Sequence, residues 1–137
     1  MKKKPFSRFL LEHPHAASAY LAEHFQADCQ PDPAVLDAKI LALIRHARNR
    51  TSSPLVRLEH TYPPFAIGRS TFLKHVRLKE QIQPIHCGPR VTAYRVVDRD
   101  AVLASMALAA RHGFMLNMKA CIAELYAPID CMTEVTA

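Results

Sequence analysis

The sequence predicts a mainly α-helical protein of the α+β class with one small β-hairpin, and three observations indicate this class. Apolar residues recur at helical spacing through most of the 137 residues. Residues 82–95 alternate instead, in the manner of two short strands around a turn. The ten prolines and three glycines favour short elements with stiff joints, and an apolar content of 50% is enough to bury one core.

Residues 1–53 are expected to form an N-terminal helical region. Apolar side chains at helical spacing predict two short helices, or one kinked at Pro14, over residues 6–25, namely Phe6, Phe9, Leu10, Ala17, Tyr20, Leu21 and Phe25. Asp32 as a cap and Pro33 as the first helical residue begin the next helix. It runs to about Arg48 with five residues inward: Val35, Leu36, Ile40, Leu43 and Ile44. Its basic end, Arg45, His46, Arg48 and Arg50, suits either the helix dipole or a DNA backbone.

The segment 54–112 follows a break at residues 51–54 and carries the clearest pattern in the chain. Leu55, Val56 and Leu58 predict a short strand or a lead-in helix, and the Pro63-Pro64 pair limits any following helix to a very short one. A second helix begins after Gly68 with Phe72, Leu73 and Val76 inward, which leaves an open side of Ser70, Thr71, Lys74, His75 and Arg77. A hairpin with its tip at residues 87–90 comes next. Asp98 then offers an N-cap for a helix that ends near His112, with Gly113 as its stop.

Residues 113–137 are expected to hold one last helix, from about Phe114 to Tyr126. Lys119 and Glu124 are expected to stay in solvent. The apolar face either closes the core of the monomer or forms the seam of a symmetric homodimer: Phe114, Met115, Met118, Ile122 and Leu125. We expect the dimer, with the N-terminal helices as a second candidate seam.

Positive charge is concentrated in one stretch. Of the net charge of +6, residues 45–99 contribute +8, while residues 1–44 are balanced and residues 100–137 contribute −2. A basic helix with short polar side chains fits the major groove of DNA, and a hairpin with an arginine near its tip can lie along the phosphates. The alternative is a solvated basic face without a partner. The pattern predicts a binder of double-stranded DNA whose contacts are Arg69, Ser70, Thr71, Lys74, His75, Arg77, Arg90 and Arg95.

Other classes of function find little support in the sequence. The four cysteines, Cys29, Cys87, Cys121 and Cys131, form no Cys-x-x-Cys pair, and neither His86-Cys87 nor His24 with Cys29 has the spacing of a compact zinc module. Ser52-Ser53, Cys87 beside His86, and the acids Asp98 and Asp100 are each isolated from the partners that nucleophilic or acid–base chemistry needs, and no phosphate-binding glycine loop is present. We therefore expect no enzyme activity, no metal and no cofactor. No apolar run has the length of a membrane span, and Met1-Lys-Lys-Lys-Pro5 lacks a signal's apolar stretch, so we expect a cytoplasmic protein.

Residues 55–106 resemble the AlpA-type phage regulators and the related excisionases. The turn and recognition helix of that family read approximately Gly-Leu-Ser-Arg-Ser-Thr-Ile-Tyr, and residues 66–73 read Ala-Ile-Gly-Arg-Ser-Thr-Phe-Leu. The family's wing pattern, Pro-x-x-x-Gly-x-Arg-x-x-x-Trp-Arg, is echoed by Pro84, Gly88, Arg90, Tyr94 and Arg95. The chain departs from the pattern in having Ala66 for the turn Gly, Gly68 for the capping Ser, Tyr94 for Trp and a foreign Pro63-Pro64 pair.

The resemblance implies a small winged helix-turn-helix akin to the DNA-binding domain of MerR regulators. It also implies a sequence-specific transcriptional regulator of a phage, plasmid or genomic island. An excisionase, which bends DNA for a recombinase, is the alternative within the same fold. A third reading is a protein-interaction adaptor or inhibitor from a mobile element, in which the N-terminal helices and the Met-rich last helix hold a protein partner.

Overall fold

The computed structural model describes residues 7–12 and 32–129, and it has the expected α+β class. Helices and small antiparallel sheets alternate along the chain, with two 3-10 helices, η2 and η3, before the basic helix α3. Their order and bounds are β1 Leu10–Glu12, α2 Pro33–Asn49, β2 Leu55–Val56, η2 Leu58–His60, η3 Pro63–Phe65, α3 Arg69–Arg77, β3 Ile85–Gly88, β4 Val91–Arg95, α4 Val96–Arg111, β5 Phe114–Leu116 and α5 Met118–Leu125.

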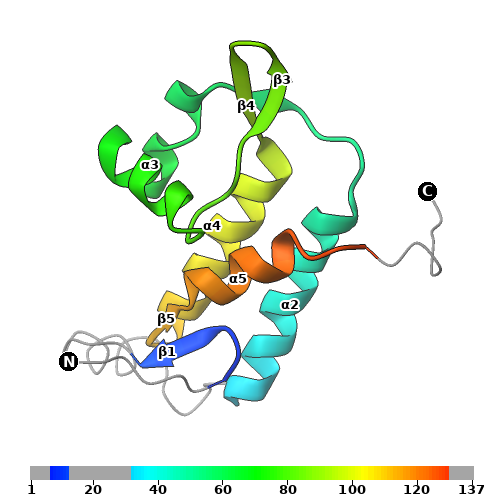
Figure 1. Cartoon of the computed structure of the whole chain (residues 1–137). Helices are drawn as coiled ribbons and strands as arrows, with labels where there is room; N and C mark the ends of the chain where they lie inside the picture. Colours follow the sequence, from blue (N-terminus) through cyan, green and yellow to red (C-terminus); the bar gives the residue numbers. More distant parts are fainter. Residues whose placement is uncertain (1–6, 13–31, 130–137) are drawn as a thin grey trace.

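The core lies where α2, α4 and α5 pack together. Helices α2 and α4 run beside each other, and α5 crosses them (Figure 1). Helix α3 and the β3–β4 hairpin lie in the upper part of Figure 1, away from the β1–β5 pair at the bottom. Buried residues of all three helices join one apolar cluster that includes Leu36, Ile40 and Ile44 of α2, Val102 and Ala109 of α4, and Cys121, Ile122 and Leu125 of α5. The segments 54–112 and 113–129 therefore share a core with α2.

Helix α2 begins as its sequence predicts. The Asp32 carboxylate caps it by accepting a hydrogen bond of 2.9 Å from the Ala34 amide, and Pro33 occupies the first helical position. Leu36, Ile40 and Ile44 are buried as expected. Val35 is 46% exposed and Leu43 is only partly buried, because the buried stripe continues through Ala47 and these two residues lie beside it.

The first strand corrects the expectation of a helix near the N-terminus. Residues 10–12 form β1, which pairs with β5 so that Leu10 faces Leu116 and Glu12 faces Phe114. Phe9 and Leu10 are buried by this pairing, and the Phe9 carbonyl accepts a bond of 2.8 Å from the Asn117 amide. The remaining expected N-terminal helical residues, 13–25, lie outside the described residues.

The expected last helix is also wrong over its first turn. Residues 114–116 form β5, and the helix starts only at Met118, where the Asn117 side chain accepts a bond of 3.2 Å from the Ala120 amide. The apolar face of α5 packs inside the monomer. The partly buried Phe114 and Met118 pack against the same core. This face is therefore not free to act as a dimer seam.

Helix α4 starts at Val96, two residues before the expected cap at Asp98. Its first amides are satisfied by the segment between α2 and β2: the Val96 amide donates to the Pro54 carbonyl at 2.9 Å, and the Val97 amide donates to Ser53 Oγ at 3.1 Å. Asp98 is consequently released from capping and lies buried in the first turn. The end of α4 is as predicted, with His112 as the cap and Gly113 at a φ of 83°.

Glu124 of α5 is buried rather than in solvent. Its carboxylate accepts from Arg8, from Arg45 at 3.1 Å and from Arg48 at 2.7 Å. Burial alone would raise the pKa of Glu124, but the hydrogen bonds from Arg45 and Arg8 and their charges outweigh it and lower the pKa. One carboxylate thus joins the N-terminal segment, α2 and α5. The fold leaves no helix in the described ranges with the length and apolar character needed to cross a membrane.

Replacing Glu124 by Gln should lower the free energy of unfolding at pH 7 by about 1–3 kcal/mol, because three arginines lose their shared carboxylate. Since the folded-state pKa is depressed, this contribution is complete above the ordinary value of 4.5 and is lost as pH falls through the folded-state pKa. Urea unfolding of both proteins should therefore show a difference that shrinks in acid. Glu59→Gln, at an exposed carboxylate without an ion pair in the described chain, is the control and should change little.

Ala66 makes a second prediction, because it has a φ of 60°, a left-handed conformation that glycine tolerates best. Ala66→Gly should raise the free energy of unfolding by about 0.5–1 kcal/mol. The same change at Ala107, exposed in the interior of α4, should lower it by about 1 kcal/mol. Thermal or urea unfolding of the two variants checks the opposite signs, and equal destabilisation by both would contradict the conformational argument.

Candidate nucleic-acid interface

Helix α3 is held on the protein through one fully buried side chain, Phe72. Its ring meets Tyr94 of β4 edge-on, with ring centroids 5.5 Å apart, and Phe65 of η3 at 6.1 Å. We call these three residues the aromatic cluster. Strand β4 is the central strand of the order β2-β4-β3, so the cluster joins α3 to the middle of the sheet.

The segment before α3 differs from a regular helix-turn-helix. A short helix does begin at Pro63, as expected, but it is a single turn of 3-10 helix that ends at Phe65. A further 3-10 turn, Leu58–His60, follows the short strand β2. The prolines explain this, because neither can donate an amide to a longer helical ladder. Ala66 then turns the chain into α3, with Gly68 as the N-cap.

The open face of α3 carries most of the predicted contact residues. Ser70, Lys74 and Arg77 are spaced at i, i+4 and i+7, so they share one exposed face, and the exposed Arg69 and Thr71 flank it. Leu73, expected inward, is 39% exposed and lies on the same open face. The nine-residue helix therefore presents the Ser70 hydroxyl and the cations Lys74 and Arg77 on one face. Arg69 adds a third cation at the start of the helix.

The hairpin forms as predicted, from β3 and β4 paired antiparallel with Ile85 opposite Ala93 and His86 opposite Thr92. Its turn is Pro89-Arg90, and the Arg90 side chain is exposed at the tip. Figure 1 shows the hairpin projecting at the same end of the molecule as α3. The structure thus brings Arg90 and the α3 residues to one end.

The basic residues divide into two groups. Arg8, Arg45, Arg48, Arg95 and Arg99 are paired with acids. In the described part of the chain, the other cations of residues 45–99 make no ion pair: Arg50, Arg57, Arg69, Lys74, Arg77, Lys79 and Arg90. Three of these belong to α3, one follows it and one is the hairpin tip. Four of these seven unpaired cations, Arg69, Lys74, Arg77 and Arg90, thus lie on α3 and at the hairpin tip.

Two predicted contact residues are turned into the protein instead. His75 is partly buried and lines a cavity of about 160 Å³ with Phe65, Ile67, Glu80, Gln81, Met106 and Met118. Arg95 forms an ion pair with Asp98 at 3.2 Å and donates to the carbonyls of Ala47, at 3.3 Å, and Arg50. Arg95 therefore fastens β4 to the end of α2, and we leave both residues out of the interface.

Sequence reasoning missed Gln83 and Tyr126, which fix the base of the hairpin. The Gln83 amide donates to the Tyr126 hydroxyl at 2.9 Å, and this hydroxyl donates to Asp98 Oδ2 at 2.9 Å. Residues 83 and 126 are far apart in the chain and neither belongs to a local motif, so no sequence signal pointed to the contact.

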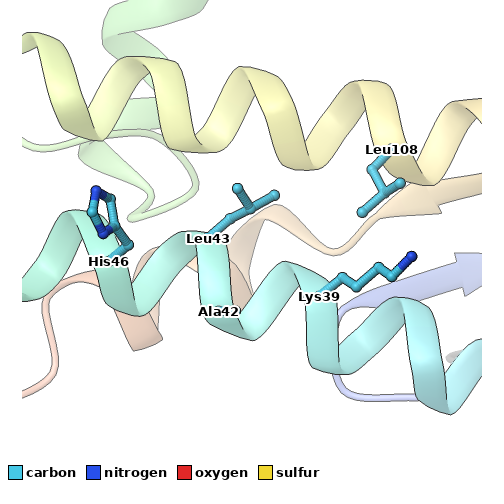
Figure 2. A pocket seen from close by; sticks show the side chains of 5 residues that line it. All are labelled: Lys39, Ala42, Leu43, His46 and Leu108. Carbon is cyan, nitrogen blue, oxygen red and sulfur yellow. The ribbon is translucent and has the colours of Figure 1, made fainter.

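A separate groove of about 400 Å³ lies between α2 and α4. It is lined by Ala42, Leu43 and Leu108, with Lys39 and His46 farther along α2 on either side (Figure 2). None of its lining residues belongs to α3 or the hairpin. Its apolar walls offer no group for acid–base or nucleophilic chemistry apart from Lys39 and His46 at its ends.

In the ranges that the structure describes, the His, Cys, Asp and Glu side chains form no group of three or more that could hold a metal ion. Cys87 is exposed and Cys121 is buried, and both are free thiols. Burial, followed by the charge of Asp37, raises the pKa of the Cys121 thiol to about 12, so this thiol is unreactive near neutral pH. Comparison of the chain with protein-family models, with curated proteins and with solved structures found no match in any of the three.

Proposed function

We propose that the protein binds double-stranded DNA in a sequence-specific manner as a transcriptional regulator. The observation that carries the proposal is the set of uncompensated cations on α3 and at the hairpin tip, two elements that meet through the aromatic cluster. A protein that keeps such charges unpaired on one short helix can exchange them for phosphate contacts and release counterions. Asp98, one of the three acids of residues 45–99, is buried and pairs with Arg95, so it does not neutralise these cations.

In the proposed complex, α3 lies in the major groove with Ser70, Thr71 and Lys74 toward the base edges. A lysine donates to guanine acceptors, and hydroxyls can donate or accept, so this face can distinguish base pairs. Arg69 and Arg77 lie near the two ends of α3, where they can contact the phosphates on either side. Arg90 at the hairpin tip contacts a neighbouring stretch of backbone.

The resemblance to AlpA-type regulators supports this proposal through one backbone detail. The family pattern has Gly in the turn before the recognition helix, and this chain has Ala66, which adopts the left-handed conformation that glycine prefers. A glycine, the family's residue at this position, would adopt the same conformation with less strain. By the same resemblance we propose that the regulated gene belongs to a phage, plasmid or genomic island.

A homodimer on two half-sites also stays a prediction, because a single module of this size buries little surface on DNA. Its seam cannot be the core-facing side of α5, which is already packed in the monomer. The protein-interaction reading loses the same surface of the last helix, while the expected N-terminal helices on which it also relied fall largely outside the described residues.

Binding should be strongly salt-dependent if the proposal is right. We expect affinity for a fluorescent duplex from the region upstream of the protein's own gene to fall by on the order of tenfold or more between about 50 and 200 mM salt. Arg77→Ala, which removes a proposed phosphate contact at an exposed position of α3, should reduce the steepness of this dependence. Lys119→Ala, which removes an exposed lysine on α5, should leave it unchanged. Anisotropy titrations in the presence of competitor DNA measure these effects. An affinity that does not change with salt, or an affinity for the upstream duplex no higher than for competitor DNA, overturns the proposal.

The helix and the hairpin should contribute differently to recognition. Lys74→Ala and Thr71→Ala should change the preferred sequence, at a cost of about 1–3 kcal/mol for each lost base contact. Arg90→Ala should weaken all sequences nearly alike, because phosphate contacts carry no sequence information. Selection of binding sites from a random pool, carried out with each variant, measures both effects. An unchanged motif with both α3 variants would show that α3 does not read the bases.

A further inference from the structure

Tyr126 stands at the point where three parts of the molecule meet. It is the C-cap of α5, its side chain reaches the chain just before β3, and it also reaches the first turn of α4. Its hydroxyl accepts a hydrogen bond from the Gln83 amide at 2.9 Å and donates one to Asp98 Oδ2 at 2.9 Å. The residue itself is 40% exposed, and its hydroxyl makes both of these contacts.

On the hairpin side, Gln83 transmits the contact to α3. The Gln83 side-chain amide donates to the Val76 carbonyl, in the last turn of α3, at 3.1 Å and to the Gln81 carbonyl at 2.8 Å. Its side-chain oxygen accepts from Lys79 at 3.3 Å. Gln83 therefore ties the end of α3 to the entrance of the hairpin, and Tyr126 holds Gln83 by its backbone.

On the other side, Asp98 anchors the hydroxyl to the helical layer. Asp98 is 1% exposed, and its second oxygen, Oδ1, lies 3.2 Å from the Arg95 guanidinium in an ion pair but accepts no hydrogen bond. Arg95 in turn donates to the carbonyls at the end of α2. The Tyr126 hydroxyl, Asp98 and Arg95 thus connect the hairpin entrance to the rigid core of α2 and α4.

From these contacts we propose that Tyr126 is a positioning residue for the hairpin, whose hydroxyl sets the angle between the hairpin and α3. The inference rests on the proposed function, because that angle matters only if both elements contact one ligand. DNA presents its groove and its phosphates at fixed relative positions, so a hairpin that is free to swing delivers Arg90 to the backbone only part of the time. The last helix then acts on recognition without touching DNA.

The contact can be tested in the free protein first. Tyr126→Phe removes the hydroxyl and keeps the ring. We expect amide exchange at Gln83 to accelerate by about tenfold or more, while the Ile44 amide in α2 keeps its rate as a reporter of the intact core. Tyr62→Phe is the matched control, since the Tyr62 hydroxyl makes no hydrogen bond within the described residues. An unchanged Gln83 rate in Tyr126→Phe overturns the proposal.

A double-mutant cycle with Arg90 then tests the effect on binding. In the wild-type background Arg90→Ala should weaken binding to the duplex by about fivefold. In the Tyr126→Phe background the same change should cost less than about twofold, because the hairpin no longer holds Arg90 in place. The Tyr62→Phe background should keep the full loss. A role in stability alone gives equal losses in all three backgrounds, and that result overturns the positioning role.

The two proposals fail in different ways. A wild-type protein that binds no duplex in the anisotropy titration overturns the proposed function and the positioning of Arg90 on DNA with it. The exchange measurement on the free protein still reports whether Tyr126 holds the hairpin. A wild type that binds DNA with equal losses in the cycle overturns only the role of Tyr126.

Discussion

The burial of Phe72 is the contact on which the candidate interface depends. Helix α3 has nine residues, which is too short to be stable alone in water, and Phe72 is its only fully buried side chain. Burial of one phenylalanine supplies about 1.5–3 kcal/mol, which offsets the ordering of about one to three of the nine residues. The contact of this ring with Tyr94 fixes α3 to the hairpin, since Tyr94 lies on β4. The remaining surface of α3 is free to be polar and charged.

The distribution of charge follows from the same division between core and surface. Asp98 and Glu124 are the buried acids of the described residues. Glu124 pairs with three arginines from other segments, whereas Asp98 pairs with the nearby Arg95 and accepts a hydrogen bond from Tyr126. Burying an acid without such partners would cost several kcal/mol. Acids therefore neutralise the arginines that hold segments together, and the cations of α3 and the hairpin tip are left without partners. A net charge of +6 alone could not distinguish these two groups.

Local signals in the sequence predicted the elements that local interactions determine. Asp32 and Pro33 start α2, and Pro89-Arg90 turns the hairpin, because capping and turn formation need only neighbouring residues. The failures involve partners far apart in the chain. Strand β1 exists because residues 114–116 pair with it, and Glu124 is buried because Arg8, Arg45 and Arg48 reach it from other segments. The Tyr126 contact and the inward positions of His75 and Arg95 belong to the same class.

Backbone strain at both ends of α3 gives a further reason to regard its placement as specific. Ala66 before the helix and Lys79 after it have φ values of 60° and 62°, and the described residues contain no other non-glycine residue with positive φ. Each such residue costs about 1 kcal/mol, and such costs persist where the surrounding structure requires the conformation. Lys79 is followed by Gln83, whose contacts with Val76 and Tyr126 set the hairpin entrance. The two strained residues thus lie at the junctions that determine the position of α3. A helix that only filled the core would need no strained residue at either junction.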